Sequence, residues 1–148
     1  MINKAEEDFR KLAVEVRVLE QSAETLASRM NMVNAVTADL SYAKIALEGL
    51  EKEQENTELL VPIGGSSYVR AKLQAPDKVV VGIGAGVSTE KTLQEAKEIV
   101  SKRLEELEKT RTSIQQQYSQ IAERINEDRE VLEELAAKLR KEKTLPNV

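Results

Sequence analysis

The first segment of the chain, residues 1–58, carries hydrophobic residues at every seventh position in two interleaved series. One series is Leu12, Leu19, Leu26, Val33, Leu40 and Leu47, and the other is Phe9, Val16, Ala23, Met30, Thr37 and Lys44. Only Thr37 and Lys44 in these series are polar. A heptad repeat sustained over this length predicts one long coiled-coil helix.

The last segment, residues 89–148, repeats in the same way. Its series are Leu93, Val100, Leu107, Ile114, Ile121, Asp128 and Leu135, and Lys97, Leu104, Arg111, Tyr118, Ile125, Leu132 and Leu139. In an antiparallel pair the two segments match, so that Leu19 faces Ile125 and each polar residue faces an apolar one, as in Val16–Asp128 and Leu47–Lys97. Lysine and arginine can extend their charged ends to water from such positions. The pattern predicts an intramolecular antiparallel coiled coil, although a shift by one heptad gives other permitted registers.

The middle segment, residues 59–88, differs in composition, because it holds five of the six glycines and two of the three prolines. Four short apolar or alternating runs predict strands at 59–63, 67–73, 78–83 and 87–90, which form two β-hairpins. We expect Ser88 or Thr89 to cap the second helix. Two hairpins are too small to bury their own apolar faces, so these faces are expected to pack against the same element in another subunit.

Composition narrows the possible functions. The 148 residues include no His and no Cys, which excludes a His or Cys metal site, a Ser-His pair, a Cys nucleophile and a disulfide. A net charge of −4 argues against nucleic-acid binding. No apolar run approaches the roughly 18 residues of a membrane span, and the acidic N-terminus is unlike a targeting peptide. We therefore expect a soluble, cytoplasmic protein that binds neither nucleic acid nor membrane.

The sequence offers little for catalysis. Gly82-Ile83-Gly84-Ala85-Gly86-Val87 partly matches the dinucleotide motif G-x-G-x-x-G, but Val87 stands where the last glycine should be. A tight turn between two strands is the favoured interpretation, and a nucleotide-binding enzyme is the alternative. The acidic clusters on the helices are interpreted as solvated faces with i,i+4 ion pairs. We expect no enzyme and no cofactor.

The two ends of the chain meet if the helices are antiparallel. Seven apolar residues gather there: Ile2, Phe9, Val14, Val131, Leu139, Leu145 and Val148. These residues allow two interpretations. In one, Phe9 and Leu139 simply close the seam between the helices; in the other, the seven residues form a tip that binds partners lacking fixed structure.

The central strands resemble those of a known family. Leu-Val-Pro-Ile-Gly-Gly-Ser-Ser-Tyr-Val-Arg-Ala-Lys-Leu, residues 60–73, and Lys-Val-Val-Val-Gly-Ile-Gly-Ala-Gly-Val, residues 78–87, between two coiled-coil helices, resemble the α-class subunit of prefoldin. The resemblance covers the whole chain as a single prefoldin-like domain, 1–148. The central strands are the part of the sequence that is specific to the α class. Subunits of the β class have one hairpin, whereas this sequence predicts two. The compact chain favours an archaeal origin.

The resemblance implies a fold that is mainly α with a small β insert, whose hairpins form β-barrels with other subunits. It implies a hexamer of two α and four β subunits, an ATP-independent chaperone that binds unfolded proteins at its coiled-coil tips and delivers them to a group II chaperonin. The subunit contacts would fall on Val61, Ile63, Tyr68, Val69, Ala71, Leu73, Val79, Val81 and Ile83. The alternative is a self-assembling coiled-coil scaffold or filament.

Overall fold

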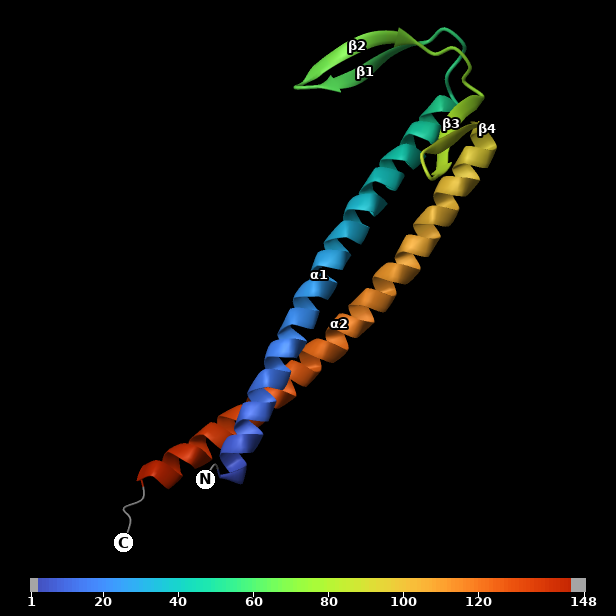
Figure 1. The fold of residues 1–148 in the computed structure, drawn as a ribbon. Coiled ribbons are helices and arrows are strands. Elements are labelled where there is room, and N and C mark those ends of the chain that lie inside the picture. The colour runs from blue at the N-terminus through green and yellow to red at the C-terminus, as the bar shows by residue number, and fades with distance from the viewer. Residues whose placement is uncertain (1–2, 145–148) are drawn as a thin grey trace. The chain divides into compact units, whose positions relative to one another are not determined.

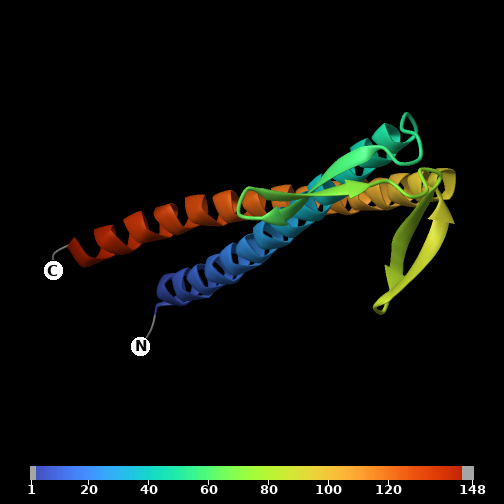
Figure 2. The ribbon, with the colours of Figure 1, turned by 90° about the horizontal axis from the view of Figure 1, so that it is seen from above.

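The structure, a computed structural model, describes residues 3–144. Two long helices, α1 (Lys4–Leu50) and α2 (Leu93–Thr144), are packed antiparallel and are joined by two β-hairpins (Figures 1 and 2). The first hairpin consists of β1 (Glu58–Gly64) and β2 (Ser67–Lys72), and the second of β3 (Lys78–Gly84) and β4 (Val87–Thr92). This architecture confirms the predicted fold class for the single chain.

The chain divides into two compact units. The terminal unit contains residues 1–34 and 109–148, and the hairpin unit contains residues 35–108. Each unit holds part of both helices and has its own buried side chains.

In the terminal unit, the buried residues other than Ala5 are predicted heptad residues. Val16, Leu26, Ile114 and Ile125 are buried, together with one charged residue of the same series, Asp128. Two interhelical ion pairs lie beside them. Arg124 Nη2 is 3.0 Å from Glu15 Oε1, and Arg129 pairs with Glu20. These pairs flank the predicted contacts Val16–Asp128 and Leu19–Ile125, as expected for charged residues at the edges of a coiled-coil seam in the predicted register.

The hairpin unit has a core where both helices meet the second hairpin. Leu47, Ala96 and Val100 are buried at its centre. Seven partly buried residues pack against them: Leu40, Ala43, Leu50, Val79, Val81, Leu93 and Leu104. Lys97, which the sequence places opposite Leu47, is half-buried, and its Nζ lies 2.5 Å from Glu51 Oε1, as expected for a lysine that extends its charged end from such a position.

The two hairpins repeat one another. Both are antiparallel, and each shifts register just before its turn, between Pro62 and Gly64 in the first and between Gly82 and Gly84 in the second. The turns have left-handed backbone at Gly65 and Ser66, and at Ala85 and Gly86. Positive φ at both central residues is what a two-residue hairpin turn requires.

The helix ends differ from the predicted boundaries. The helix α1 ends at Leu50 and not at residue 58, because the following residues fold into tight turns and Asn56 adopts a left-handed conformation. At the other junction β4 continues to Thr92. Thr92 Oγ1 accepts a hydrogen bond of 3.1 Å from the Glu95 N–H and so caps α2. The predicted cap at Ser88 or Thr89 is therefore wrong, since both residues belong to the β4 ladder.

Candidate assembly and binding surfaces

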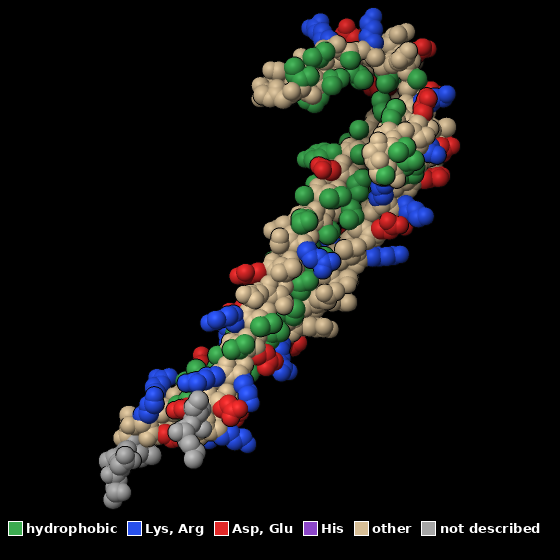
Figure 3. Space-filling view, in the orientation of Figure 1, with side chains coloured by type: hydrophobic (Ala, Val, Ile, Leu, Met, Phe, Trp, Pro, Cys, Tyr) green, Lys and Arg blue, Asp and Glu red, His purple; other side chains and the backbone are tan. Residues whose placement is uncertain are grey.

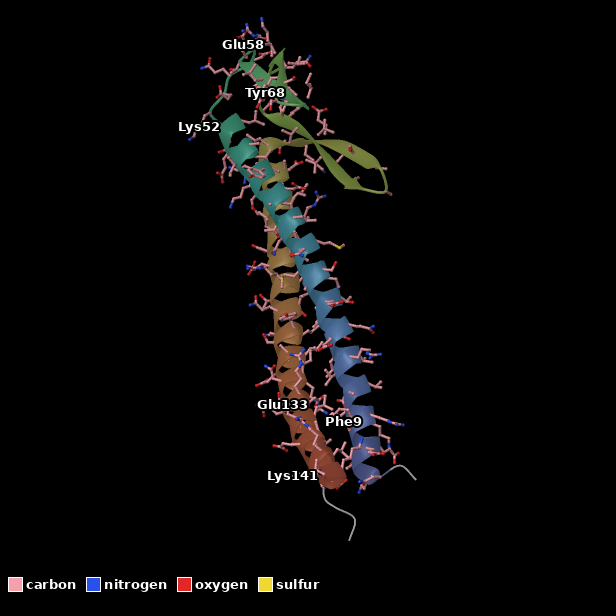
Figure 4. The ribbon with its side chains drawn as sticks, turned by 90° about the vertical axis from the view of Figure 1, so that its left-hand side faces the viewer. Phe9, Lys52, Glu58, Tyr68, Glu133 and Lys141 are labelled. Carbon is pink, nitrogen blue, oxygen red and sulfur yellow. The ribbon has the colours of Figure 1, made fainter. Side chains whose placement is uncertain are left out.

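Large apolar side chains are exposed on both hairpins. On the first hairpin, Leu60 is 66% and Tyr68 60% exposed; on the second, Val80 is 74% exposed. We call the full set the hairpin surface: Leu60, Val61, Ile63, Tyr68, Val69, Val80, Ile83 and Val87. Figure 3 shows apolar side chains along the hairpins, and Figure 4 labels Glu58 and Tyr68 on the first one. Exposed apolar surface of this kind marks a site of protein association.

The predicted contact residues fall into two groups. Val61, Ile63, Tyr68, Val69 and Ile83 are exposed in the single chain. The others are half-buried: Ala71, Leu73, Val79 and Val81. The last two pack against the core of the hairpin unit, and thus against the chain's own helices.

The predicted contact residues do not include three members of the hairpin surface: Leu60, Val80 and Val87. In β1 and β3 the predicted contact residues are alternate residues on one face only, Val61 and Ile63 in β1 and Val79, Val81 and Ile83 in β3. The signal for the other face is the uninterrupted apolar run in β1 (Leu59–Ile63) and in β3 (Val79–Val81), which was used only to predict the strands. Such a run, in place of strict alternation, is typical of strands that are covered on both faces.

The glycine-rich motif lies at the turn of the second hairpin. It leads from β3 into β4 and not into a helix, with Ala85 at φ 50° and Gly86 at φ 73°. A dinucleotide motif needs a helix N-terminus directly after its glycines to hold the pyrophosphate. The tight-turn interpretation is therefore correct. Among residues 3–144, no group of three or more acidic side chains is arranged to hold a metal ion.

The predicted tip residues are placed differently from one another. Phe9 and Leu139 are half-buried and line one shallow pocket with Glu6, Arg10 and Lys143. Val14 and Val131 are exposed. The remaining three predicted residues, Ile2, Leu145 and Val148, lie outside the described residues. Figure 4 shows Phe9 on α1.

Charged contacts stabilise the helices of the terminal unit. The hydrogen bond from Lys11 and its positive charge lower the pKa of Glu7, whose Oε1 lies 2.8 Å from Lys11 Nζ. The hydrogen bond to Glu15 and the charge of Asp128 raise the pKa of Arg124. At the start of α1, Asn3 Oδ1 accepts a hydrogen bond from the Ala5 N–H, and Asn3 Nδ2 donates to Glu142 Oε2 on α2.

An antiparallel coiled coil with two exposed hairpins is the architecture of an assembling subunit, and comparison with known proteins gives its family. The prefoldin subunit family matches residues 19–138. The prefoldin subunit alpha of Methanococcoides burtonii is 34% identical over 125 residues, which are 84% of this chain and 91% of that protein. That of Methanosarcina mazei is 36% identical over 136 residues, 90% of this chain and 93% of that protein.

A solved structure has the same fold. The filamentous PFD from Methanocaldococcus jannaschii, determined by cryo-electron microscopy, aligns with a TM-score of 0.66 and 27% identity, over 76% of this chain and 93% of that one. The chain therefore belongs to the prefoldin subunit family, in its alpha class.

Membership has direct consequences. This is a family of non-enzymatic chaperones, so the chain has a chaperone role, and the alpha class implies assembly with beta subunits. The curated relatives described above are archaeal. No helix within residues 3–144 is long and apolar enough to cross a membrane.

Proposed function

We propose that this chain is one of two alpha subunits in a cytoplasmic hexamer with four beta subunits, whose hairpins join in β-barrels. The hexamer binds unfolded proteins at the ends of its coiled coils without ATP, prevents their aggregation and delivers them to a group II chaperonin. The observation that carries the proposal is the hairpin surface, which covers both faces of the first hairpin with exposed apolar side chains.

The hairpins explain why the chain needs partners. A two-stranded hairpin is marginally stable in water on its own. Val79 and Val81 anchor the second hairpin to the core of the hairpin unit, whereas Leu60, Ile63 and Tyr68 of the first remain exposed. Burying these side chains in a barrel with other subunits would remove apolar area from water and complete the sheets.

The terminal unit supports client binding at the ends of the helices. Val14 and Val131 are exposed, one on each helix. Each such site is small and would bind weakly. Six of them on one particle would hold an unfolded chain through multivalency, which needs no chemical step.

Client binding is tested with Val14→Ser and Val131→Ser combined. The double variant should keep its helicity and assembly, because both side chains are exposed, but should suppress the aggregation of guanidinium-unfolded citrate synthase less well. Met32→Ser is the matched control, since Met32 is also exposed on α1 in the terminal unit. If the double variant and the control suppress aggregation equally well, Val14 and Val131 do not bind clients and the proposed site is wrong.

Assembly is tested by the native mass of the chain, alone and co-expressed with the single-hairpin beta subunit of the same genome, using light scattering. A closed complex of about six chains that forms only with the beta subunit supports the hexamer. If the chain forms no complex with the beta subunit, the hexamer proposal is wrong.

The second candidate is a self-assembling scaffold. Its support is the fold match to a prefoldin that is described as filamentous. It predicts open-ended polymers of this chain alone, with a mass that keeps rising with concentration, since a head-to-tail interface that does not close on itself forms filaments. The same light-scattering series separates the two candidates.

A further inference from the structure

The terminal unit has a groove along one side of the helix seam. Its floor consists of three apolar residues, Val18 and Leu26 of α1 and Ile121 of α2. Its rim consists of residues with hydroxyl or amide side chains: Gln21, Ser22, Thr25 and Gln117. None of these lining residues is charged, and the groove holds about 360 Å³, which is within the usual range of binding pockets.

The residues that flank the seam change character at this groove. One heptad closer to the chain ends, Arg124 Nη2 lies 3.0 Å from Glu15 Oε1 across the seam. Ser22 and Gln117 stand at the equivalent positions of the next heptad, seven residues further along their helices. Charged residues at such positions usually bridge the two helices, and their long stems cover the seam. A serine is too short to do so, and the groove lies where this cover is missing.

The neutral lining belongs to a longer neutral segment of α2. Residues 112–122 contain no charged residue, although charged residues make up 32% of the whole chain. Most of this segment is exposed, and the exposed faces of coiled-coil helices are normally charged. The segment presents hydroxyl and amide groups instead, and an amide side chain both donates and accepts hydrogen bonds, as a peptide backbone does.

The rim of the groove has hydrogen-bonding capacity to spare. Gln117 Nε2 donates a hydrogen bond of 3.2 Å to Ser113 Oγ, and its carbonyl oxygen Oε1 can accept a further one. The Thr25 hydroxyl donates 3.1 Å to the backbone oxygen of Gln21 and keeps its own oxygen as an acceptor. Within residues 3–144, the side-chain amide of Gln21 has no hydrogen-bond partner.

The charge and the hydrogen-bonding groups of the lining define what the groove can hold. A charged side chain would lose water there and meet no opposite charge, which costs free energy. An extended backbone offers N–H and C=O groups to Gln21 and Gln117, and its alternate side chains point to one side. On that side they would meet Val18, which is exposed, and Ile121, which is half-buried. The matching partner is therefore an extended segment in which apolar residues alternate with Ser, Thr, Asn or Gln.

We propose that this groove binds extended, uncharged segments of unfolded client proteins. Apolar client side chains pack against Val18 and Ile121, and the client backbone bonds to Gln21 and Gln117. The groove is continuous with the proposed client site, because Val14 and Val18 are neighbours one turn apart on α1 and are 61% and 54% exposed. The inference rests on the proposed client binding, and it adds a second contact that selects neutral segments.

The groove can be closed by continuing the ion pairs of the seam for one more heptad. Ser22→Glu combined with Gln117→Arg repeats the pair of Glu15 and Arg124, so the helices and the assembly should be kept. The probe is the acetylated and amidated peptide Ser-Val-Asn-Leu-Thr-Val-Gln-Ala, and its affinity for the chain is measured by saturation-transfer NMR. The double variant should bind this peptide about tenfold more weakly, because the new side chains cover the floor and bring charge into the groove.

The matched control makes the same two changes outside the groove. Ser28→Glu combined with Gln116→Arg alters exposed residues of the same two helices that do not line it, and should leave the affinity unchanged. Equal affinities of the two double variants would overturn the inference. In the wild-type chain, the charged peptide Ser-Val-Asp-Leu-Thr-Val-Glu-Ala should bind about tenfold more weakly than the neutral one, and equal binding would contradict the selection of neutral segments.

Photo-cross-linking gives a second measurement that does not depend on the folding of the double variant. The photoreactive residue p-benzoylphenylalanine replaces Gln117 in one chain and Gln116 in another, and each chain is assembled with the beta subunit. The neutral peptide should cross-link to the chain modified at Gln117, which lines the groove, and not to the chain modified at Gln116. Equal yields at the two positions would show that the peptide does not occupy the groove.

The outcomes separate this inference from the proposed function. If the complex protects citrate synthase, but closing the groove changes nothing and the two cross-linking positions react equally, the groove assignment is wrong and the chaperone proposal stands. If the wild-type complex does not protect citrate synthase, the proposed function fails, and the inference that rests on it fails with it.

Discussion

Asp128 is the residue at which the coiled-coil seam departs most from its pattern. It is 5% exposed, its Oδ2 has no hydrogen-bond partner among the described residues, and its Oδ1 lies 3.3 Å from Arg124 Nε. A buried carboxylate with an unsatisfied oxygen costs free energy that an apolar side chain of similar size does not.

We therefore expect Asp128→Leu to raise the free energy of unfolding by about 1–2 kcal/mol, as measured by urea denaturation. The conservative variant Asp128→Asn keeps a buried polar group and should gain less. Arg124→Ala, which removes the partner of Asp128, should instead destabilise the protein. A loss of stability in Asp128→Leu would show that the carboxylate contributes to the fold beyond its contact with Arg124.

The ion pair between Glu7 and Lys11 makes the first turns of α1 sensitive to pH. The lowered pKa of Glu7 means that the pair stabilises the folded helix when the carboxyl is ionised. This stabilisation is present above the ordinary glutamate pKa and is lost as the pH falls below about 4. In an NMR titration of the Glu7 carboxyl carbon, Lys11→Ala should return the pKa to the ordinary range. An unchanged titration would mean that Lys11 does not hold the carboxylate in solution.

At the scale of whole elements, the helix seam depends on a few closely packed residues. Leu47 is buried against Ala96 and Val100 in the hairpin unit. Leu47→Ala removes buried methyl groups and leaves a cavity, so it should lower the free energy of unfolding by about 3 kcal/mol. Ile45→Ala is the matched control on the same helix, because Ile45 is 64% exposed. Thermal denaturation followed by circular dichroism distinguishes them, and equal losses would contradict the described core.

The sequence predicted the helices, the strands and the register because each depends on a periodic pattern. Leu47, Val100 and Ile125 each belong to one of the predicted heptad series, and each is buried, as expected. Pattern alone did not locate the cap of α2, since Ser88, Thr89 and Thr92 are all chemically able to cap a helix. Only the length of the β4 ladder decides among them.

The surfaces were harder to predict than the elements. A heptad series shows which residues face the partner helix, but it does not show which strand face meets the chain's own helices. Val79 and Val81 lie against the core of the hairpin unit, whereas their equivalents on β1 do not belong to it. The two hairpins have similar sequences, and their different surroundings depend on long-range packing.

For the molecule as a whole, the hairpin surface should control assembly independently of the helices. Val80→Asp places a charge on the most exposed apolar residue of that surface. It should abolish the complex with the beta subunit while leaving the helix content unchanged, because Val80 is outside the core of the hairpin unit. Met32→Asp, 63% exposed on α1, is the control. Light scattering and circular dichroism on the same samples measure both effects, and a full-size complex of Val80→Asp would contradict the role of this surface.

The antiparallel arrangement of α1 and α2 also imposes an order on folding. The interhelical contact between Lys97 and Glu51 joins residues 46 apart in sequence, that between Arg124 and Glu15 joins residues 109 apart, and that between Asn3 and Glu142 joins residues 139 apart. Loop-closure entropy grows with separation, and local contacts form first. The hairpins should therefore close early and the two chain ends should meet last. The end where Asn3 meets Glu142 has seam contacts on one side only, so the seam is expected to open there first, as frayed ends do.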